Sequence, residues 1–369
     1  MDLRDYPAID HHAHNLLRPE DADSNPYAAA FTEATDGEAI KRHARHTLFF
    51  RRSLRDVAGL LECEPTEEAI LTRRRELGFD RLASICFEAA NLSEVFLDDG
   101  FLPDRVVTWE DHRRFVPVRR ILRLEYLAET LMEEAKGFED FLERFSACLD
   151  PPPAGVIGLK SIAAYRSGLA IESISHEAAR SSFEAMRLRP SGRLMEKPLI
   201  DFLLARALDL AARYRLPVQF HTGLGDPDMD LRLGNPLHLR PILENGRWRN
   251  VPIVLLHAGY PFVRETGYLA AVYPQVHADF GLAVPFLSVS GMRAVLRDLL
   301  ALTPSTKILF SSDAHLIPEL FYLGAKWGRA ILGDVLDEAV RDSDLTVREA
   351  EEAAERILAR NAVELYRID

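Results

Sequence analysis

Short apolar runs that end in polar residues recur along the chain. Eight stand out, at residues 7–15, 93–101, 118–125, 154–166, 216–226, 251–260, 275–283 and 307–315. Continuous rather than alternating hydrophobicity is typical of parallel strands that are buried on both faces. The segments between the runs have the apolar spacing of helices, for example at 199–215 and 291–304. The pattern therefore predicts alternating strands and helices, an α/β protein.

Eight such units in 369 residues favour a (β/α)8 TIM barrel that spans residues 1–369 as a single domain. A doubly wound sheet is less well supported because no glycine-rich dinucleotide fingerprint follows a strand. The stretch between the first two runs is too long for one connection and has helical periodicity at 38–61 and 65–90. We expect a helical insertion at 16–92 over the active-site face. A helix at 346–366 is expected to close the barrel.

Composition and charge narrow the class of partner. The chain is 47% hydrophobic, carries a net charge of −12 and has no block of Lys and Arg, so a small molecule is expected as the substrate and no nucleic acid. No apolar stretch reaches membrane-spanning length, and the first residues lack the features of a signal peptide, which predicts no membrane association and a cytoplasmic location. The three cysteines are far apart, so neither a disulfide framework nor a thiolate zinc site is expected.

Polar residues at the strand ends suggest a metal site. His12 and His14 are two residues apart on the first strand, so they share one face and can reach a single ion. His221, His257 and Asp313 end the fifth, sixth and eighth predicted strands. In an α/β barrel the carboxyl ends of the strands form the active-site face. Imidazoles with a carboxylate are the ligand set expected for zinc, manganese or iron.

The sequence resembles the amidohydrolase superfamily of metal-dependent barrels. The closest likeness is to the amidohydrolase-related (amidohydrolase 2) branch, which also forms the N-terminal domain of FluG/nodulin-type glutamine synthetase fusions; no glutamine-synthetase-like segment is expected in this chain. The motifs that carry the resemblance are IDHHAHN, FLDDGF, GLKSIAAYRSGL, PVQFHTGLGD, DLRLGNPLHLRPIL, LLHAGYPF and LFSSDAH. The resemblance implies that His12, His14 and Asp313 bind the more buried metal, whereas His221 and His257 hold a second metal or contact the substrate.

Lys160 leaves the number of ions open. It lies in the apolar fourth strand, where a lysine is costly unless it is paired or modified. The resemblance suggests a carboxylated Lys160 that bridges two ions. The alternative is an ammonium that faces a carboxylate in a one-metal site. Zinc is the preferred divalent metal, with manganese or iron as alternatives, and one or two ions fit the sequence.

A metal site of this kind suggests a hydrolytic mechanism. The ion would lower the pKa of its bound water to about 7, and the resulting metal-bound hydroxide would attack a substrate carbonyl. Asp313 would orient the water and carry its proton to the leaving group, and His257 or the metal would stabilise the oxyanion. The predicted enzyme is a metal-dependent hydrolase (amidohydrolase) of the C–N bond in a small amide.

Two arginines could grip a substrate carboxylate, such as that of a γ-glutamyl compound. Arg123 and Arg166 lie at the ends of the third and fourth strands, and a guanidinium matches a carboxylate in a bidentate manner. The alternatives are ion pairs that stiffen the barrel rim, Arg123 with Glu125 and Arg166 with an aspartate. His238 and His315 are further candidate substrate contacts.

Three other polar residues close to these motifs have simpler interpretations. Asp98 and Asp99 could fix the tautomers of the first-strand histidines or start the turn at Gly100. His11 faces away from His12 and His14 and is expected to point outward rather than to bind metal.

Two alternative functions stay open at this point. A barrel with the same ligands could be a metal-dependent decarboxylase (C–C lyase) of a small carboxylic acid, since fold does not settle function. It could also be a non-catalytic, metal-binding regulatory barrel. Self-association into a homo-oligomer is compatible with either.

Overall fold

The fold is a (β/α)8 barrel, as the sequence predicts. The computed structural model describes residues 1–22, 24–188 and 192–368. Its strands form one sheet in the order β1 to β8, and the registered pairs are parallel. Each predicted apolar run overlaps one strand. The strands are β1 (Ala8–Ala13), β2 (Leu92–Asp98), β3 (Val118–Arg123), β4 (Val156–Ser161), β5 (Val218–Phe220), β6 (Ile253–Leu255), β7 (Val276–Asp279) and β8 (Ile308–Leu309).

Helices separate the strands along the chain. They are α1 (Gly37–His43), α2 (Leu48–Leu61), α3 (Glu67–Ala90), α4 (Trp109–His112), α5 (Leu124–Glu134), α6 (Phe138–Ala147), α7 (His176–Arg187), α8 (Lys197–Tyr214), α9 (Arg240–Leu243), α10 (Val263–Val272), α11 (Ala283–Phe286), α12 (Val289–Leu300), α13 (Pro318–Arg341), α14 (Val347–Glu355) and α15 (Asn361–Tyr366). The predicted helices at 199–215 and 291–304 correspond to α8 and α12.

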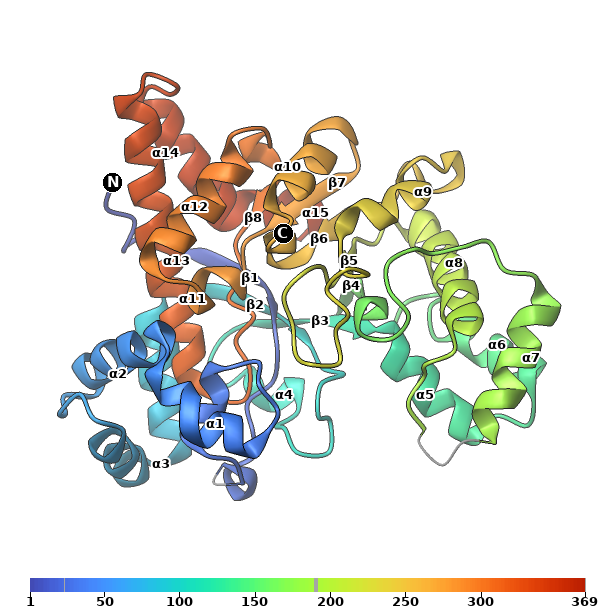
Figure 1. Ribbon diagram of the computed structural model, residues 1–369, viewed down its shortest axis with the longest axis horizontal. Coiled ribbons are helices and arrows are strands. Elements are labelled where there is room, and N and C mark those ends of the chain that lie inside the picture. Colours follow the sequence, from blue (N-terminus) through green and yellow to red (C-terminus); the bar gives the residue numbers. More distant parts are fainter. Residues whose placement is uncertain (23, 189–191, 369) are drawn as a thin grey trace. The chain divides into compact units, whose positions relative to one another are not determined.

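The contacts divide the chain into two compact units, 1–119 with 279–369 and 120–278. In the first unit, α3 packs along α13 (Figure 1). In the second, α7 packs along α8 (Figure 1). The residues of β1 are all buried, which agrees with a strand covered on both faces.

The connection from β1 to β2 is helical. Thr66 caps α3 by accepting a hydrogen bond from Ala69 N, and Asn91 ends the helix in a left-handed conformation directly before β2. Gly78, at φ 69°, breaks the helical geometry inside α3. The structure thus shows helices where the sequence predicts them, whereas their placement over the active-site face stays a prediction.

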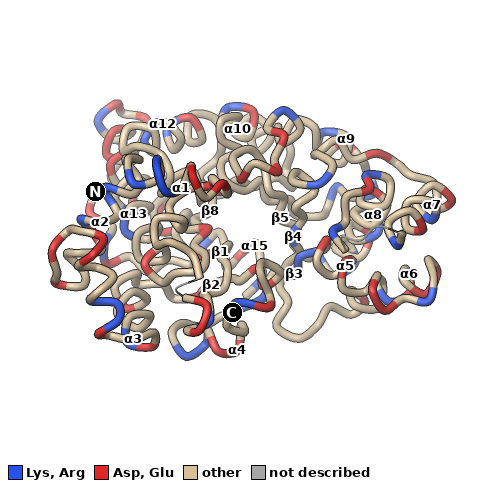
Figure 2. The backbone as a smooth tube through the Cα atoms, turned by 60° about the horizontal axis from the view of Figure 1, so that its bottom comes forward, with Lys and Arg blue, Asp and Glu red and all other residues tan. Residues whose placement is uncertain are grey.

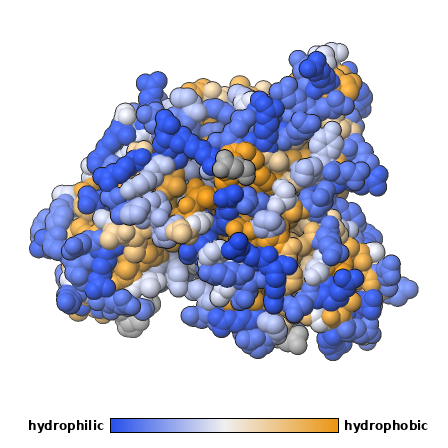
Figure 3. Space-filling view, turned by 180° about the vertical axis from the view of Figure 1, so that it is seen from behind, coloured by the Kyte–Doolittle hydropathy of each residue, from blue (hydrophilic) through white to orange (hydrophobic). Residues whose placement is uncertain are grey.

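Charges of both signs are distributed over the outer helices. Both α3 and α6 carry acidic and basic residues (Figure 2). Hydrophilic residues cover most of the face shown in Figure 3. None of the helices in the described part of the chain combines the length and the apolarity that a membrane span needs.

A buried histidine in the first unit is held in its neutral form. His112 ends α4, and its Nε2 accepts a hydrogen bond of 3.1 Å from Leu16 N. The ring lies edge-on to Phe87, with centroids 5.7 Å apart, and is tilted against Phe321. Burial, with a smaller contribution from Arg114, lowers the pKa of His112 to about 3. A proton on Nε2 would remove the acceptor that the Leu16 N–H needs.

This histidine predicts a loss of stability in mild acid. Its pKa is about 6.5 in an unfolded chain and lower in the folded one, so its contribution is complete above pH 6.5 and falls as the pH drops. Between pH 7 and pH 5 the free energy of unfolding should decrease by about 2 kcal/mol through His112. His112→Gln keeps an acceptor but does not titrate, so it should lack this part of the decrease in urea unfolding at the two pH values. The exposed control His43→Gln should behave as the wild type, and equal losses in His112→Gln and wild type would contradict the assignment.

Candidate metal centre

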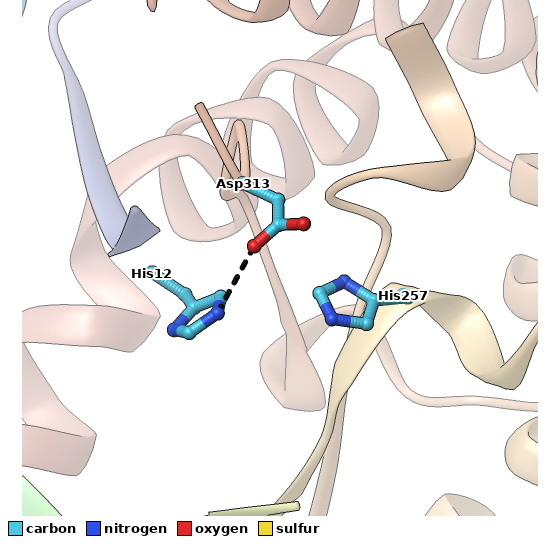
Figure 4. Close-up of side chains that lie close together, drawn as sticks. All are labelled: His12, His257 and Asp313. Atoms are coloured by element: carbon cyan, nitrogen blue, oxygen red, sulfur yellow. Dashed lines mark ion pairs between the residues drawn. The ribbon is translucent and has the colours of Figure 1, made fainter. Parts of the chain in front are cut away.

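One carboxylate oxygen at the end of β8 contacts both predicted ligands on β1. Asp313 Oδ1 lies 3.1 Å from His12 Nε2 and 3.3 Å from His14 Nε2. Figure 4 draws the first of these contacts as a dashed line. All three residues are buried. The two-residue spacing of the histidines thus places both rings on one face of β1, as alternation requires.

The backbone between the two strands fixes this contact. Asp313 N donates to His12 O at 3.1 Å, and His14 N donates to Ala314 O at 2.7 Å. The φ of Asp313 is 53°, in the left-handed region that residues other than glycine rarely adopt. Such a conformation costs about 1 to 3 kcal/mol and persists where surrounding contacts impose it, often at functional sites.

The second nitrogen of His14 determines how its ring is used. His14 Nδ1 lies 3.2 Å from the carbonyl oxygen of Asp98. A carbonyl only accepts, so Nδ1 carries a proton, and in the neutral ring Nε2 then presents a lone pair to the carboxylate of Asp313. Two electron-rich atoms facing each other are stabilised by a cation between them. The donor set therefore fits a divalent metal ion.

Asp98 takes both roles that the sequence suggests. Its carbonyl orients His14, and its Oδ1 accepts a hydrogen bond of 3.2 Å from Gly100 N, which forms the turn after β2. One ligand atom each from His12, His14 and Asp98 lies within 4.8 Å of the others. This grouping is a further arrangement that could hold a metal ion.

The second unit contains a pair of buried histidines, His221 directly after β5 and His257 two residues after β6. His257 Nε2 lies 3.1 Å from His221 Nδ1. His221 Nε2 lies 2.9 Å from Leu224 O, so this nitrogen carries the proton and Nδ1 accepts from His257. His257 and Ala258 have φ values of 65° and 53° within the turn Leu256–Gly259. The ring of Tyr165 lies against His221, with centroids 4.4 Å apart.

Lys160 lies in β4 and is 1% exposed. A buried ammonium is costly unless it is paired or chemically modified. The burial agrees with the expectation from the sequence, and both interpretations of Lys160 stay predictions.

Arg166 has an acidic partner, but a different one from that expected. Its Nη2 lies 3.2 Å from Glu129 Oε1, so the predicted pairing with an aspartate is replaced by one with a glutamate of α5. Leu194 N donates to the same oxygen at 2.7 Å. Burial raises the pKa of Glu129. The local sequence could not indicate this partner because it lies 37 residues away.

Arg123 and Glu125, at the end of β3, are both buried. Glu125 Oε1 accepts a hydrogen bond of 2.7 Å from Ser161 Oγ. Burial is the main reason that the pKa of Glu125 is raised, while the nearby charge of Arg123 lowers it.

The two further histidines that were predicted to contact substrate lie in different environments. His315 Nδ1 lies 3.1 Å from Asp313 O, and burial lowers the pKa of this histidine. His238 lies in the turn Pro236–Leu239 and is partly exposed, with Nε2 at 3.0 Å from Arg232 O. A role in substrate binding stays a prediction for both.

Sequence reasoning missed two buried aspartates. His11 turns away from the metal-site histidines, as alternation predicts. It is fully buried rather than directed to solvent. Its Nε2 lies 3.1 Å from Asp279 Oδ2, and its Nδ1 lies 3.2 Å from Tyr366 Oη. Asp10 is also fully buried and binds Ser312, and burial raises its pKa to about 7. The period of two that pairs His12 with His14 also includes Asp10, so this signal was available in the sequence.

The comparisons with known proteins agree with this picture. The family model described as Amidohydrolase matches residues 132–368. Protein fluG of Emericella nidulans is 32% identical over 408 residues, which cover all of this chain and 46% of that protein, so the chain spans about half the length of this relative. A crystal structure from Lactobacillus casei ATCC 334, assigned as a metal-dependent hydrolase, has a TM-score of 0.89 and 31% identity, covering 99% of this chain and 97% of the other. A uronate isomerase from Bacillus halodurans C-125 shares the fold, with a TM-score of 0.69, 12% identity and coverage of 100% and 94%.

A glycine two residues after His221 lets two backbone segments approach closely. Gly223 has a φ of 70°, and a Cβ at this position would lie 2.2 Å from Tyr260 O and 2.5 Å from Gly259 C. The neighbouring Thr222 Oγ1 donates to Leu256 O at 2.6 Å. The loops that follow β5 and β6 are thus in backbone contact directly beside the histidine pair.

This contact predicts a strong effect of a single methyl group. Gly223→Ala should lower the free energy of unfolding by about 2 to 4 kcal/mol, because a side chain at positive φ adds to the overlap with backbone atoms. Urea denaturation measures the change. The control Gly246→Ala, where a Cβ meets nothing within 4 Å, should change stability by no more than about 0.5 kcal/mol. Equal stabilities of the two variants would contradict the tight approach.

Proposed function

The chain belongs to the amidohydrolase family, and from that premise we propose that it is a metal-dependent hydrolase of the C–N bond in a small amide. The observation that carries the proposal is the Asp313 carboxylate oxygen shared by two buried imidazoles, one of which presents a lone pair to it. This arrangement suits a bound cation better than a purely structural ion pair.

The other predicted ligands also lie near the carboxyl ends of strands. In a (β/α)8 barrel the carboxyl ends of the strands meet at one end, where the active site is built. His221 directly follows β5, His257 lies two residues after β6, and His12 lies near the end of β1. We therefore propose His12, His14, His221, His257 and Asp313, with Lys160 of β4, as the metal ligands.

The residues of this centre have different proposed roles in amide hydrolysis. A divalent ion held by them would lower the pKa of a water molecule and polarise the substrate carbonyl. Asp313 accepts the proton of the attacking water and delivers it to the leaving nitrogen. His257, or the ion itself, would stabilise the carbonyl oxygen as negative charge develops there. The strained backbone at both residues agrees with such roles.

The substrate proposed for this site carries a carboxylate. Arg166 and Arg123 lie after β4 and at the end of β3, and both side chains are largely buried. A guanidinium in such a place recognises a carboxylate in a bidentate manner, and Glu129 holds Arg166 in position until a substrate group arrives. His238 and His315 are the further residues proposed to contact the substrate.

Metal content is the first test of the proposed centre. Elemental analysis of protein prepared with bicarbonate and without chelator should find at least one divalent ion per chain, and zinc is the expected metal. His12→Ala/His14→Ala should lose it, whereas the exposed pair His43→Ala/His46→Ala should retain it. About two ions per chain would support a carboxylated Lys160 as a bridge, and about one would favour an ammonium at Lys160. A metal-free wild type would contradict the centre.

Turnover of a substrate panel tests the reaction class. γ-Glutamyl amides should be hydrolysed faster than amides without a carboxylate. Asp313→Asn should reduce kcat at least about 1000-fold with the same melting temperature, because the proton carrier is lost. Release of CO₂ from small carboxylic acids without amide hydrolysis would make the protein a decarboxylase. A metal-loaded wild type inactive on the whole panel would favour a regulatory barrel, and an active, metal-loaded Asp313→Asn variant would contradict the role of Asp313.

A further inference from the structure

Two serines directly before Asp313 are each held by a buried aspartate. Ser312 N donates to Asp10 Oδ1 at 2.9 Å, and Ser312 Oγ donates to Asp10 Oδ2. Ser311 Oγ donates to Asp279 Oδ2. Ser311 and Ser312, called the serine pair below, are 2% and 3% exposed, and both aspartates are fully buried.

The two aspartates that bind the serine pair come from β1 and β7. Asp10 lies in β1 and Asp279 ends β7. Asp279 Oδ2 also lies 3.1 Å from His11 Nε2. Ser311 and Ser312 thus bind different aspartates, Asp279 and Asp10. The backbone that leads into Asp313 is therefore held by two buried carboxylates.

Glycines leave the room that the serine pair occupies. A Cβ at Gly324 of α13 would lie 2.6 Å from Ser312 Cβ. A Cβ at Gly281 would lie 1.9 Å from Ser311 Oγ and 3.1 Å from Asp279 Oδ2. Glycines in two other segments of the chain thus leave space for these serines. This space indicates that the serine contacts are a specific feature of the fold.

Asp313 needs this support because its backbone is strained. Its φ is 53°, and its carboxylate must reach both His12 and His14. The N–H of Ala314, the residue after Asp313, donates to Ser312 Oγ at 2.9 Å. The same serine oxygen donates to Asp10, so it links this aspartate to the backbone on the far side of the strained residue. Loss of that oxygen would allow the backbone at Asp313 to relax.

We propose that Asp10 and Asp279 are positioning residues that act through the serine pair to hold Asp313 in contact with His12 and His14. This inference rests on the proposed metal centre. In this proposal, the two aspartates and the serine pair do not touch substrate. They set the geometry of Asp313, a metal ligand that also carries the proton. The expected signature is a loss of metal affinity and of kcat, with little change in KM.

The test compares Zn²⁺ affinity, measured by competition with a chromophoric chelator, across serine variants. Ser312→Ala and Ser311→Ala should each weaken Zn²⁺ binding about 10-fold or more and lower kcat, as is usual when a group that orients a metal ligand is removed. Asp10→Asn retains an acceptor for Ser312 N and should retain more affinity than Ser312→Ala. The exposed helical control Ser181→Ala should bind Zn²⁺ as the wild type does.

A crystal structure of metal-free Ser312→Ala supplies a readout that does not depend on activity. The Asp313 carboxylate should lie more than 4 Å from at least one of the two imidazoles. If wild type binds Zn²⁺ and Ser312→Ala binds it equally with Asp313 in place, the positioning role is overturned while the proposed function stands. If the wild type binds no Zn²⁺, the proposed function itself fails. A Ser312→Ala variant with wild-type kcat would likewise overturn the positioning role.

Discussion

The site depends on one buried carboxylate oxygen that two imidazoles share. The Asp313 contacts to His12 and His14 bring together strands that lie at opposite ends of the sequence. Neutral histidines with lone pairs directed at a carboxylate oppose one another electrostatically, so this arrangement is stable only with a proton or a cation in the cluster. A permanently bound ion would satisfy all three groups at neutral pH. The polar chemistry at the end of β1 and β8 follows from this requirement.

Backbone strain marks the residues to which we assign the chemistry. Asp313 and His257 both have left-handed φ values, and Ala258 beside His257 shares the conformation. Folding retains such conformations only where neighbouring contacts compensate for them. Asp10, with Ser312, provides such contacts in the first unit, and Gly223 provides space for them in the second. Groups held in this way need little reorganisation when charge develops in a reaction.

Membership of the amidohydrolase family sets the type of centre but not the substrate. The Bacillus halodurans uronate isomerase has the same fold at 12% identity, which shows the architecture alone. The residues that can distinguish substrates lie outside the ligand set. We propose Arg166, held by Glu129, for this role, because a charged partner can be exchanged for a substrate carboxylate without leaving the guanidinium unpaired.

Sequence alone determined the barrel and the positions of the ligands that we propose. Apolar runs buried on both faces indicate parallel strands, and a spacing of two places His12 and His14 on one face, so these features depend on local pattern. Tertiary structure alone decided the pairing of Arg166 with Glu129, the burial of His11 against Asp279, and the left-handed backbone at Asp313. The reason is physical: these features arise from contacts between residues tens to hundreds of positions apart, and a hydrogen bond or a strained φ depends on which groups folding brings within reach.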